Sequence, residues 1–163
     1  MPAMIAALAA LGGVAVGVML EPVRLAAARR AQVRQDRIER CVRLLELAND
    51  IRHQVLDISR IFHGRRPAVD SPEWERWERL NLPLYQSRAQ LRAVAGVLRI
   101  YGPSELAQGA ESVRRAASGL SAARFAQGVY GESDDLPASV LGVVEEFNGA
   151  LDAFADVAAR YVG

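Results

Sequence analysis

Residues 41–62 read CVRLLELANDIRHQVLDISRIF, and apolar side chains recur in this stretch at intervals of seven residues. One series consists of Cys41, Ala48, Val55 and Phe62, and the other of Leu44, Ile51 and Ile58. Such a pair of series is the a/d pattern of helices that pack side by side. The stretch therefore predicts a helix with one buried face, which ends at Gly64 and Pro67.

Three further stretches show the same kind of stripe. Ser71 as the N-cap and Pro72 at the first helical position begin one helix, which ends at Gly102-Pro103. Asn81-Leu82-Pro83 predicts a kink or an interruption inside it. Ser104 begins the next helix, whose glycines weaken the prediction. The positions expected in the stripes are Leu84, Leu91, Val94, Leu98 and Tyr101; Leu106, Ala110, Val113, Ala117 and Leu120; and Val140, Val144, Phe147, Leu151, Phe154, Ala158 and Tyr161.

Residues 3–20, AMIAALAALGGVAVGVML, carry no charge over 18 residues. As a helix they would measure about 27 Å, close to the ~30 Å hydrocarbon core of a bilayer. This predicts a transmembrane helix. Two alternatives are a cleaved signal peptide, which lacks its basic n-region here, and a buried core helix.

Arginines follow this segment immediately. Residues 24–43 contain seven arginines and two acidic residues, and the chain has no lysine. The positive-inside rule predicts an N-terminus outside the cell membrane and a cytoplasmic C-terminal body. Anionic head groups are the expected partner of this basic stretch. Nucleic acid is not expected, because no aromatic side chains for base stacking are interleaved with the arginines. The predicted lipid-surface residues are Arg24, Arg29, Arg30, Arg34 and Arg37.

Charge is distributed unevenly along the chain. Residues 21–66 hold 11 arginines against six acidic residues, a charge of +5, and residues 100–163 hold four against nine, a charge of −5. This gradient of charge indicates that the two ends of the chain have different surroundings or face each other.

The loops at 64–71 and 128–134 are expected at one end of the bundle, as solvated turns or as two halves of a docking surface.

Ala9, Gly13 and Gly17 recur every four residues and share one helix face. Small residues at this spacing favour close packing of two transmembrane helices. They make a homo-oligomer an open alternative. They also support a second functional hypothesis, a phage-type or envelope membrane-active protein whose anchor self-associates.

Few side chains in the sequence are candidates for metal binding or catalysis. Glu46, Asp50, His53 and Asp57 share one helix face, but a di-iron bundle needs a second such set on facing helices. A metal-binding helical protein is therefore only a remote alternative. Cys41 lies in the apolar stripe, where a thiol is usually buried and inert. We expect no enzyme activity, no catalytic residue, no cofactor and no metal.

Trp74 and Trp77 lie in EWERWER, residues 73–79. Their spacing places them on one face of a helix. They either close the membrane-distal end of the bundle or form a contact for a protein partner, since tryptophan is enriched at binding hot spots.

The sequence thus predicts an all-α protein in which an N-terminal transmembrane helix continues into an antiparallel bundle of about four helices with coiled-coil-like packing. The expected helices lie near 24–63, 72–101, 104–127 and 135–162, joined by short connections, with no sheet. The predicted domains are a transmembrane anchor at 1–21, an arginine-rich juxtamembrane stalk at 22–43 and a cytoplasmic bundle at 44–163. The leading functional hypothesis is a non-enzymatic, single-pass membrane scaffold or adaptor for a protein partner of unknown identity. The alanine-rich, lysine-free composition of the chain is typical of GC-rich bacterial or bacteriophage coding sequences.

Overall fold

The computed structural model describes the backbone of residues 2–63, 65–123, 125 and 138–162. Within this set, side chains are described for residues 21, 23–63, 65–123, 125 and 140–161. Four helices account for nearly all described residues, and no strand occurs among them. They are α1 (Pro2–Phe62), α2 (Pro72–Tyr101), α3 (Ser104–Ala123) and α4 (Ala138–Val162).

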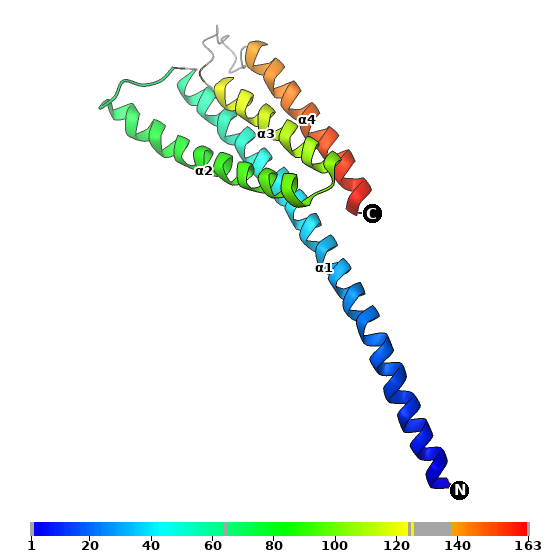
Figure 1. Ribbon diagram of the computed structural model, residues 1–163. Helices are drawn as coiled ribbons and strands as arrows, with labels where there is room; N and C mark the ends of the chain where they lie inside the picture. The colour runs from blue at the N-terminus through cyan, green and yellow to red at the C-terminus, as the bar shows by residue number, and fades with distance from the viewer. Residues whose placement is uncertain (1, 64, 124, 126–137, 163) are drawn as a thin grey trace. The chain divides into compact units, whose positions relative to one another are not determined.

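The chain divides into two units, Met1–Arg37 and Ile38–Gly163. In the second unit, the end of α1 lies beside α2, α3 and α4, and successive helices run in opposite directions (Figure 1). The all-helical prediction and the prediction of a helical bundle are confirmed.

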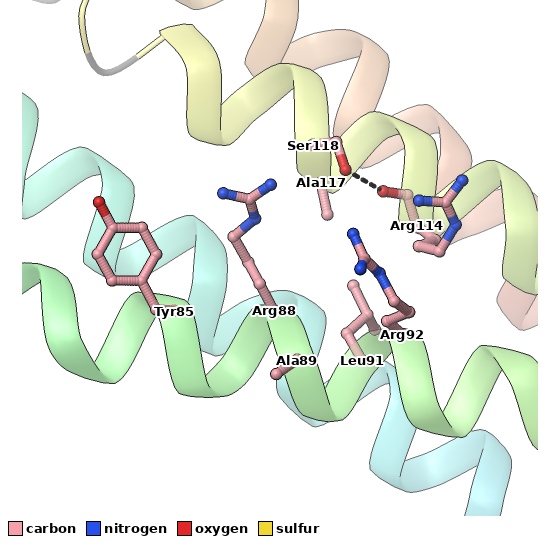
Figure 2. A pocket seen from close by; sticks show the side chains of 8 residues that line it. All are labelled: Tyr85, Arg88, Ala89, Leu91, Arg92, Arg114, Ala117 and Ser118. Atoms are coloured by element: carbon pink, nitrogen blue, oxygen red, sulfur yellow. Dashed lines mark hydrogen bonds between the residues drawn. The ribbon is translucent and has the colours of Figure 1, made fainter.

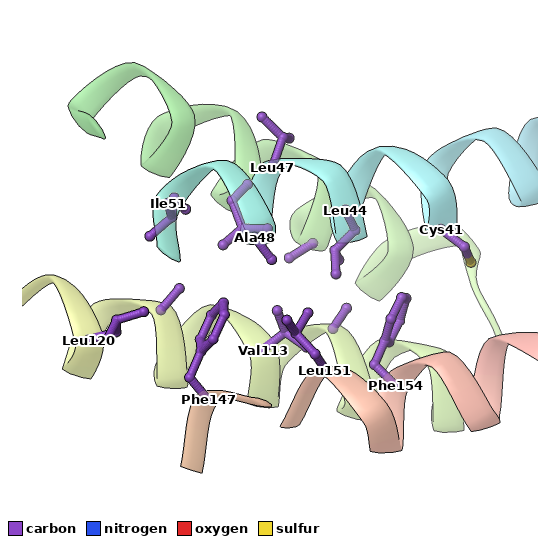
Figure 3. Packing of buried hydrophobic residues seen from close by; sticks show 14 of the residues in the cluster. Cys41, Leu44, Leu47, Ala48, Ile51, Val113, Leu120, Phe147, Leu151 and Phe154 are labelled. Atoms are coloured by element: carbon purple, nitrogen blue, oxygen red, sulfur yellow. The ribbon is translucent and has the colours of Figure 1, made fainter. Parts of the chain in front are cut away.

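The predicted stripes of α1, α3 and α4 form most of the core of this bundle, together with leucines of α2. Every stripe position of these helices is buried or packs against the buried cluster, apart from Val140, which is buried outside it. Figure 3 shows the side chains of α1 meeting those of α3 and α4, with Phe147 and Phe154 of α4 pointing toward α1. Both rings are 0% exposed, so α4 supplies the largest side chains that are completely buried.

Helix α2 departs from its predicted stripe at both ends. Leu84, Leu91 and Leu98 are buried as expected, but Tyr101 is 75% exposed. Tyr101 is the last residue of α2, where the chain turns into α3 at Gly102, and the neighbouring helices do not cover it. At the other end, Trp77 is buried and extends the core beyond the predicted positions.

Of the kink or interruption predicted at Asn81-Leu82-Pro83, the interruption does not occur: α2 is helical from Pro72 to Tyr101 with Pro83 inside it. Proline removes one backbone hydrogen bond of a helix. The buried Asn81 side chain donates a hydrogen bond of 2.8 Å to the carbonyl oxygen of Trp77. Asn81 and Leu84, on either side of the proline, are both 0% exposed, and their burial against the neighbouring helices favours the continuous helix over a break.

Ser71 occupies the predicted N-cap position, but its side chain makes no capping hydrogen bond. The backbone N–H of Trp74 donates instead to the carbonyl oxygen of Ser71 at 2.9 Å. A backbone hydrogen bond, not the Ser71 side chain, therefore stabilises the first turn of α2. Pro72 supplies the favourable φ of this turn.

The close approach of α4 explains why a glycine is tolerated at position 109, inside α3. A Cβ atom at this position would lie 3.0 Å from Cδ2 of Phe154. The missing side chain therefore lets the Phe154 ring of α4 approach α3 closely.

No helix within the described part of the chain is long and apolar enough to cross a membrane. The side chains of residues 1–20 are outside this description, so the anchor at 1–21 remains a prediction from the sequence. The acidic loop at 128–134 and residues 124, 126 and 127, in the predicted third helix, likewise lie outside the described residues.

Candidate functional site

The residues predicted for lipid contact lie on α1. The side chains of Arg24, Arg29, Arg30 and Arg34 are exposed, and Arg37 is half-buried. The remaining described side chains from residue 21 to residue 35 are exposed as well. Ala9, Gly13 and Gly17, the predicted packing face, lie within α1, but their side chains are outside the described set.

An aromatic cluster forms where α2 begins. The rings of Trp74 and Trp77 stack with their centroids 5.1 Å apart and their planes 25° apart. Phe125, just beyond α3, extends the cluster, with its ring centroid 6.4 Å from that of Trp77. We call Arg66, Trp74, Trp77 and Phe125 the aromatic tip.

Arg66 covers both tryptophans. Its guanidinium carbon lies 5.2 Å from the Trp74 ring centroid and 5.3 Å from the Trp77 ring centroid. These distances are within the range of cation–π attraction. Trp77 is 5% exposed, Trp74 is half-buried and Phe125 is 40% exposed. The aromatic tip thus has a fixed interior at Trp77 and an accessible outer edge at Trp74 and Phe125.

The two tryptophans are expected to differ in solvent access. A Trp74→Phe variant retains Trp77, whose burial predicts blue-shifted fluorescence that acrylamide quenches poorly. A Trp77→Phe variant retains the half-buried Trp74 and should be quenched more readily. Stern–Volmer titration of both variants measures the difference. Equal quenching of the two would contradict the packing of the aromatic tip.

A second site, between α2 and α3, was not predicted from the sequence. A cavity of about 190 Å³ is lined by arginines from both helices and by a few small or hydroxyl-bearing side chains. Figure 2 shows Arg88 and Arg92 extending from α2 toward α3. We call this cavity the arginine groove. Its lining residues are Tyr85, Arg88, Ala89, Leu91, Arg92, Arg114, Ala117 and Ser118.

Arg114 is the arginine of this groove with a paired charge. Its Nη2 lies 2.5 Å from Oε1 of Glu111, and its Nε donates to Oε2 of Glu111 at 2.8 Å. The hydrogen bonds from Arg114 hold the pKa of the Glu111 carboxyl below its usual value of 4.5, although burial acts in the opposite direction. The charges of Arg114, Arg115 and Arg99 lower this pKa further. Arginines of α2 and α3 therefore act together on this one carboxylate.

A sequence signal for the arginine groove exists in α2. Residues 84–101 include Arg88, Arg92 and Arg99 but no acidic residue. Arg88 and Arg92 are four residues apart and share a helix face. The contribution of Arg114 from α3 required the helix pairing, which the stripe pattern alone does not specify.

The acidic face of α1 does not form a metal site within the described residues. Glu46, Asp50, His53 and Asp57 are all exposed. No group of three or more His, Cys, Asp or Glu side chains in the described part of the chain is placed to hold a metal ion. Cys41 is buried, as expected for an apolar stripe position.

Comparison with known proteins finds no matching family model, no matching curated protein and no matching solved structure.

Proposed function

We propose that this chain is a non-enzymatic adaptor, attached to a membrane by its N-terminal helix, whose helical bundle binds a protein partner. The aromatic tip is the observation that supports partner binding most strongly. The exposed arginines of α1 that follow residues 3–20 support the attachment to lipid.

The aromatic tip has the composition of a protein-binding hot spot. Tryptophan and arginine are enriched at such sites, where a few aromatic side chains contribute most of the binding energy. Trp74 is stacked on the buried Trp77 and covered by Arg66, so its ring is held in one orientation before a partner arrives. Little side-chain entropy would then be lost when a partner contacts the exposed edge.

Apolar side chains are exposed on Phe125 of the aromatic tip and in the segments that precede α2. Val69, in the segment between α1 and α2, is 64% exposed, and Phe125 is 40% exposed. Ile61 in the last turn of α1 is 38% exposed. These side chains gain free energy when a partner removes them from water, at roughly 25 cal/mol per Å² of apolar surface.

Membrane attachment rests on the sequence of residues 3–20 and on the arginines that follow it. Arg24, Arg29 and Arg30 are exposed on a continuous helix, so their guanidinium groups are available to anionic head groups. Each arginine near an anionic surface contributes about 1 kcal/mol of attraction. The apolar residues 3–20 and the arginines that follow them therefore both support a location of this segment at a membrane.

Photo-crosslinking tests partner binding at the aromatic tip. A photoreactive phenylalanine analogue at position 74, in the chain expressed in its native cells, is expected to yield a discrete crosslinked protein. The same analogue at Gln86, an exposed position of α2 away from the aromatic tip, serves as the matched control. Identical crosslinking at positions 74 and 86, or none at position 74, would contradict the proposal.

A further inference from the structure

The arginine groove lies within the unit formed by residues 38–163, and its charge is not balanced inside the fold. Three arginines line it, from two helices, and its lining residues include no carboxylate. Arg114 is paired with Glu111. Within the described residues, neither Arg88 nor Arg92 has an ion-pair partner.

Holding these arginines around one cavity raises the electrostatic free energy of the bundle, because like charges repel. The lowered pKa of Glu111 reports additional positive charge from Arg99 and Arg115 on the same surface. Arg99, Arg114 and Arg115 act on this one carboxylate, and Arg88 and Arg92 are not among the charges that lower its pKa. An anion in the arginine groove would reduce this repulsion.

The groove also has the size and the donors for a small oxyanion. Its volume of about 190 Å³ leaves room for several water molecules or for one compact polyatomic anion. Arg88 and Arg92 extend their guanidinium groups into the space between α2 and α3 (Figure 2). A guanidinium presents a planar fork of N–H donors that matches two oxygens of one anion.

We propose that the arginine groove binds a phosphate group, with Arg88 and Arg92 as its principal ligands and Arg114 adding positive charge from α3. A phosphate fits better than a carboxylate because its several oxygens can accept hydrogen bonds from guanidinium groups on different sides. A carboxylate has two oxygens and is satisfied by one guanidinium fork. Free phosphate and the phosphate of a lipid head group share this chemistry.

NMR signals of the arginine Nε–Hε groups test this binding directly. The full chain in non-ionic detergent micelles is titrated with inorganic phosphate, and sodium chloride keeps the ionic strength constant. The signals of Arg88 and Arg92 are expected to shift and saturate. A parallel titration uses nanodiscs of phosphatidylcholine with increasing phosphatidylglycerol, to identify a lipid head group as the source.

Matched variants distinguish phosphate binding in the arginine groove from nonspecific attraction of phosphate to exposed arginines. The double variant Arg88→Gln/Arg92→Gln is expected to weaken phosphate binding at least tenfold. The double variant Arg76→Gln/Arg79→Gln removes two exposed arginines from the same helix outside the groove and should leave binding within twofold. Glu111→Gln should tighten binding severalfold, because it removes the competing carboxylate from Arg114.

Loss of helicity in the Arg88→Gln/Arg92→Gln variant would make Arg92→Gln alone the deciding variant, since Arg92 is exposed and Arg88 is half-buried. Saturation with inorganic phosphate identifies a soluble anion, and saturation only with phosphatidylglycerol identifies a lipid head group. Both results support the site. The proposal is overturned if neither titration saturates, or if the Arg76→Gln/Arg79→Gln variant weakens binding equally. Neither outcome bears on membrane attachment or on the aromatic tip, so the two proposals fail separately.

Discussion

Replacing Phe147 with alanine is expected to lower the free energy of unfolding of the bundle by about 3–5 kcal/mol. The Phe147 ring is 0% exposed and lies in the cluster shared by α1, α3 and α4. Alanine would remove most of its contacts and leave a cavity that close-packed neighbours fill only partly. Because single domains are stable by about 5–15 kcal/mol, this is a large part of the total. Urea unfolding followed by circular dichroism measures the loss.

Leu141→Ala is the matched control for this measurement. Leu141 lies on the same helix, but its side chain is 47% exposed. Substitutions at exposed positions usually change stability by no more than about 0.5 kcal/mol. A Phe147→Ala variant that loses no more stability than Leu141→Ala would contradict the packing of α4 against α1 and α3.

Reversing the charge of Arg24, Arg29, Arg30, Arg34 and Arg37 to glutamate is expected to abolish binding to anionic vesicles in a chain that starts at residue 22. At about 1 kcal/mol per arginine, neutralising these five side chains alone costs about 5 kcal/mol, a factor of several thousand in partition. Reversal to glutamate adds repulsion to that loss. Co-sedimentation with vesicles of phosphatidylglycerol measures the partition.

Two controls accompany the charge reversal. Vesicles of phosphatidylcholine alone should bind neither chain, and added salt should weaken the binding of the unchanged chain, because exposed charges are screened. The variant Arg76→Glu/Arg79→Glu carries reversed charges on exposed positions of α2 and should bind much as the unchanged chain does. Equal loss of binding in both variants would show that the arginines of α1 have no special role.

Much of the bundle follows from the heptad spacing of apolar residues. The stripes of α1, α3 and α4 identified the buried side chains, and the capping and breaking residues predicted the start and end of α2. Local signals failed where tertiary contacts outweighed them. A kink or an interruption was expected at Asn81-Leu82-Pro83, and the interruption does not occur, since α2 continues through Pro83 with Asn81 and Leu84 buried. Tyr101 fitted the spacing but lies where α2 ends and no neighbour covers it.

The candidate sites were less predictable than the fold. The tryptophans were noticed because of their type and spacing. Their arrangement also depends on Arg66, in the segment before α2, and on Phe125, which is distant in sequence. The arginine groove depends on which helix lies beside α2, since Arg114 comes from α3. Apolar periodicity states which face of each helix is buried. It does not state which polar side chains of two neighbouring helices meet.

Membrane partition tests the proposed function most directly. The full chain and a chain that starts at Arg24 are expressed, and the membranes are extracted with alkaline carbonate. The proposal predicts that the full chain stays in the membrane pellet, while the shorter chain is released as a folded helical protein. Release of the full chain into the carbonate supernatant would contradict it, because residues 3–20 would then not be embedded in the bilayer.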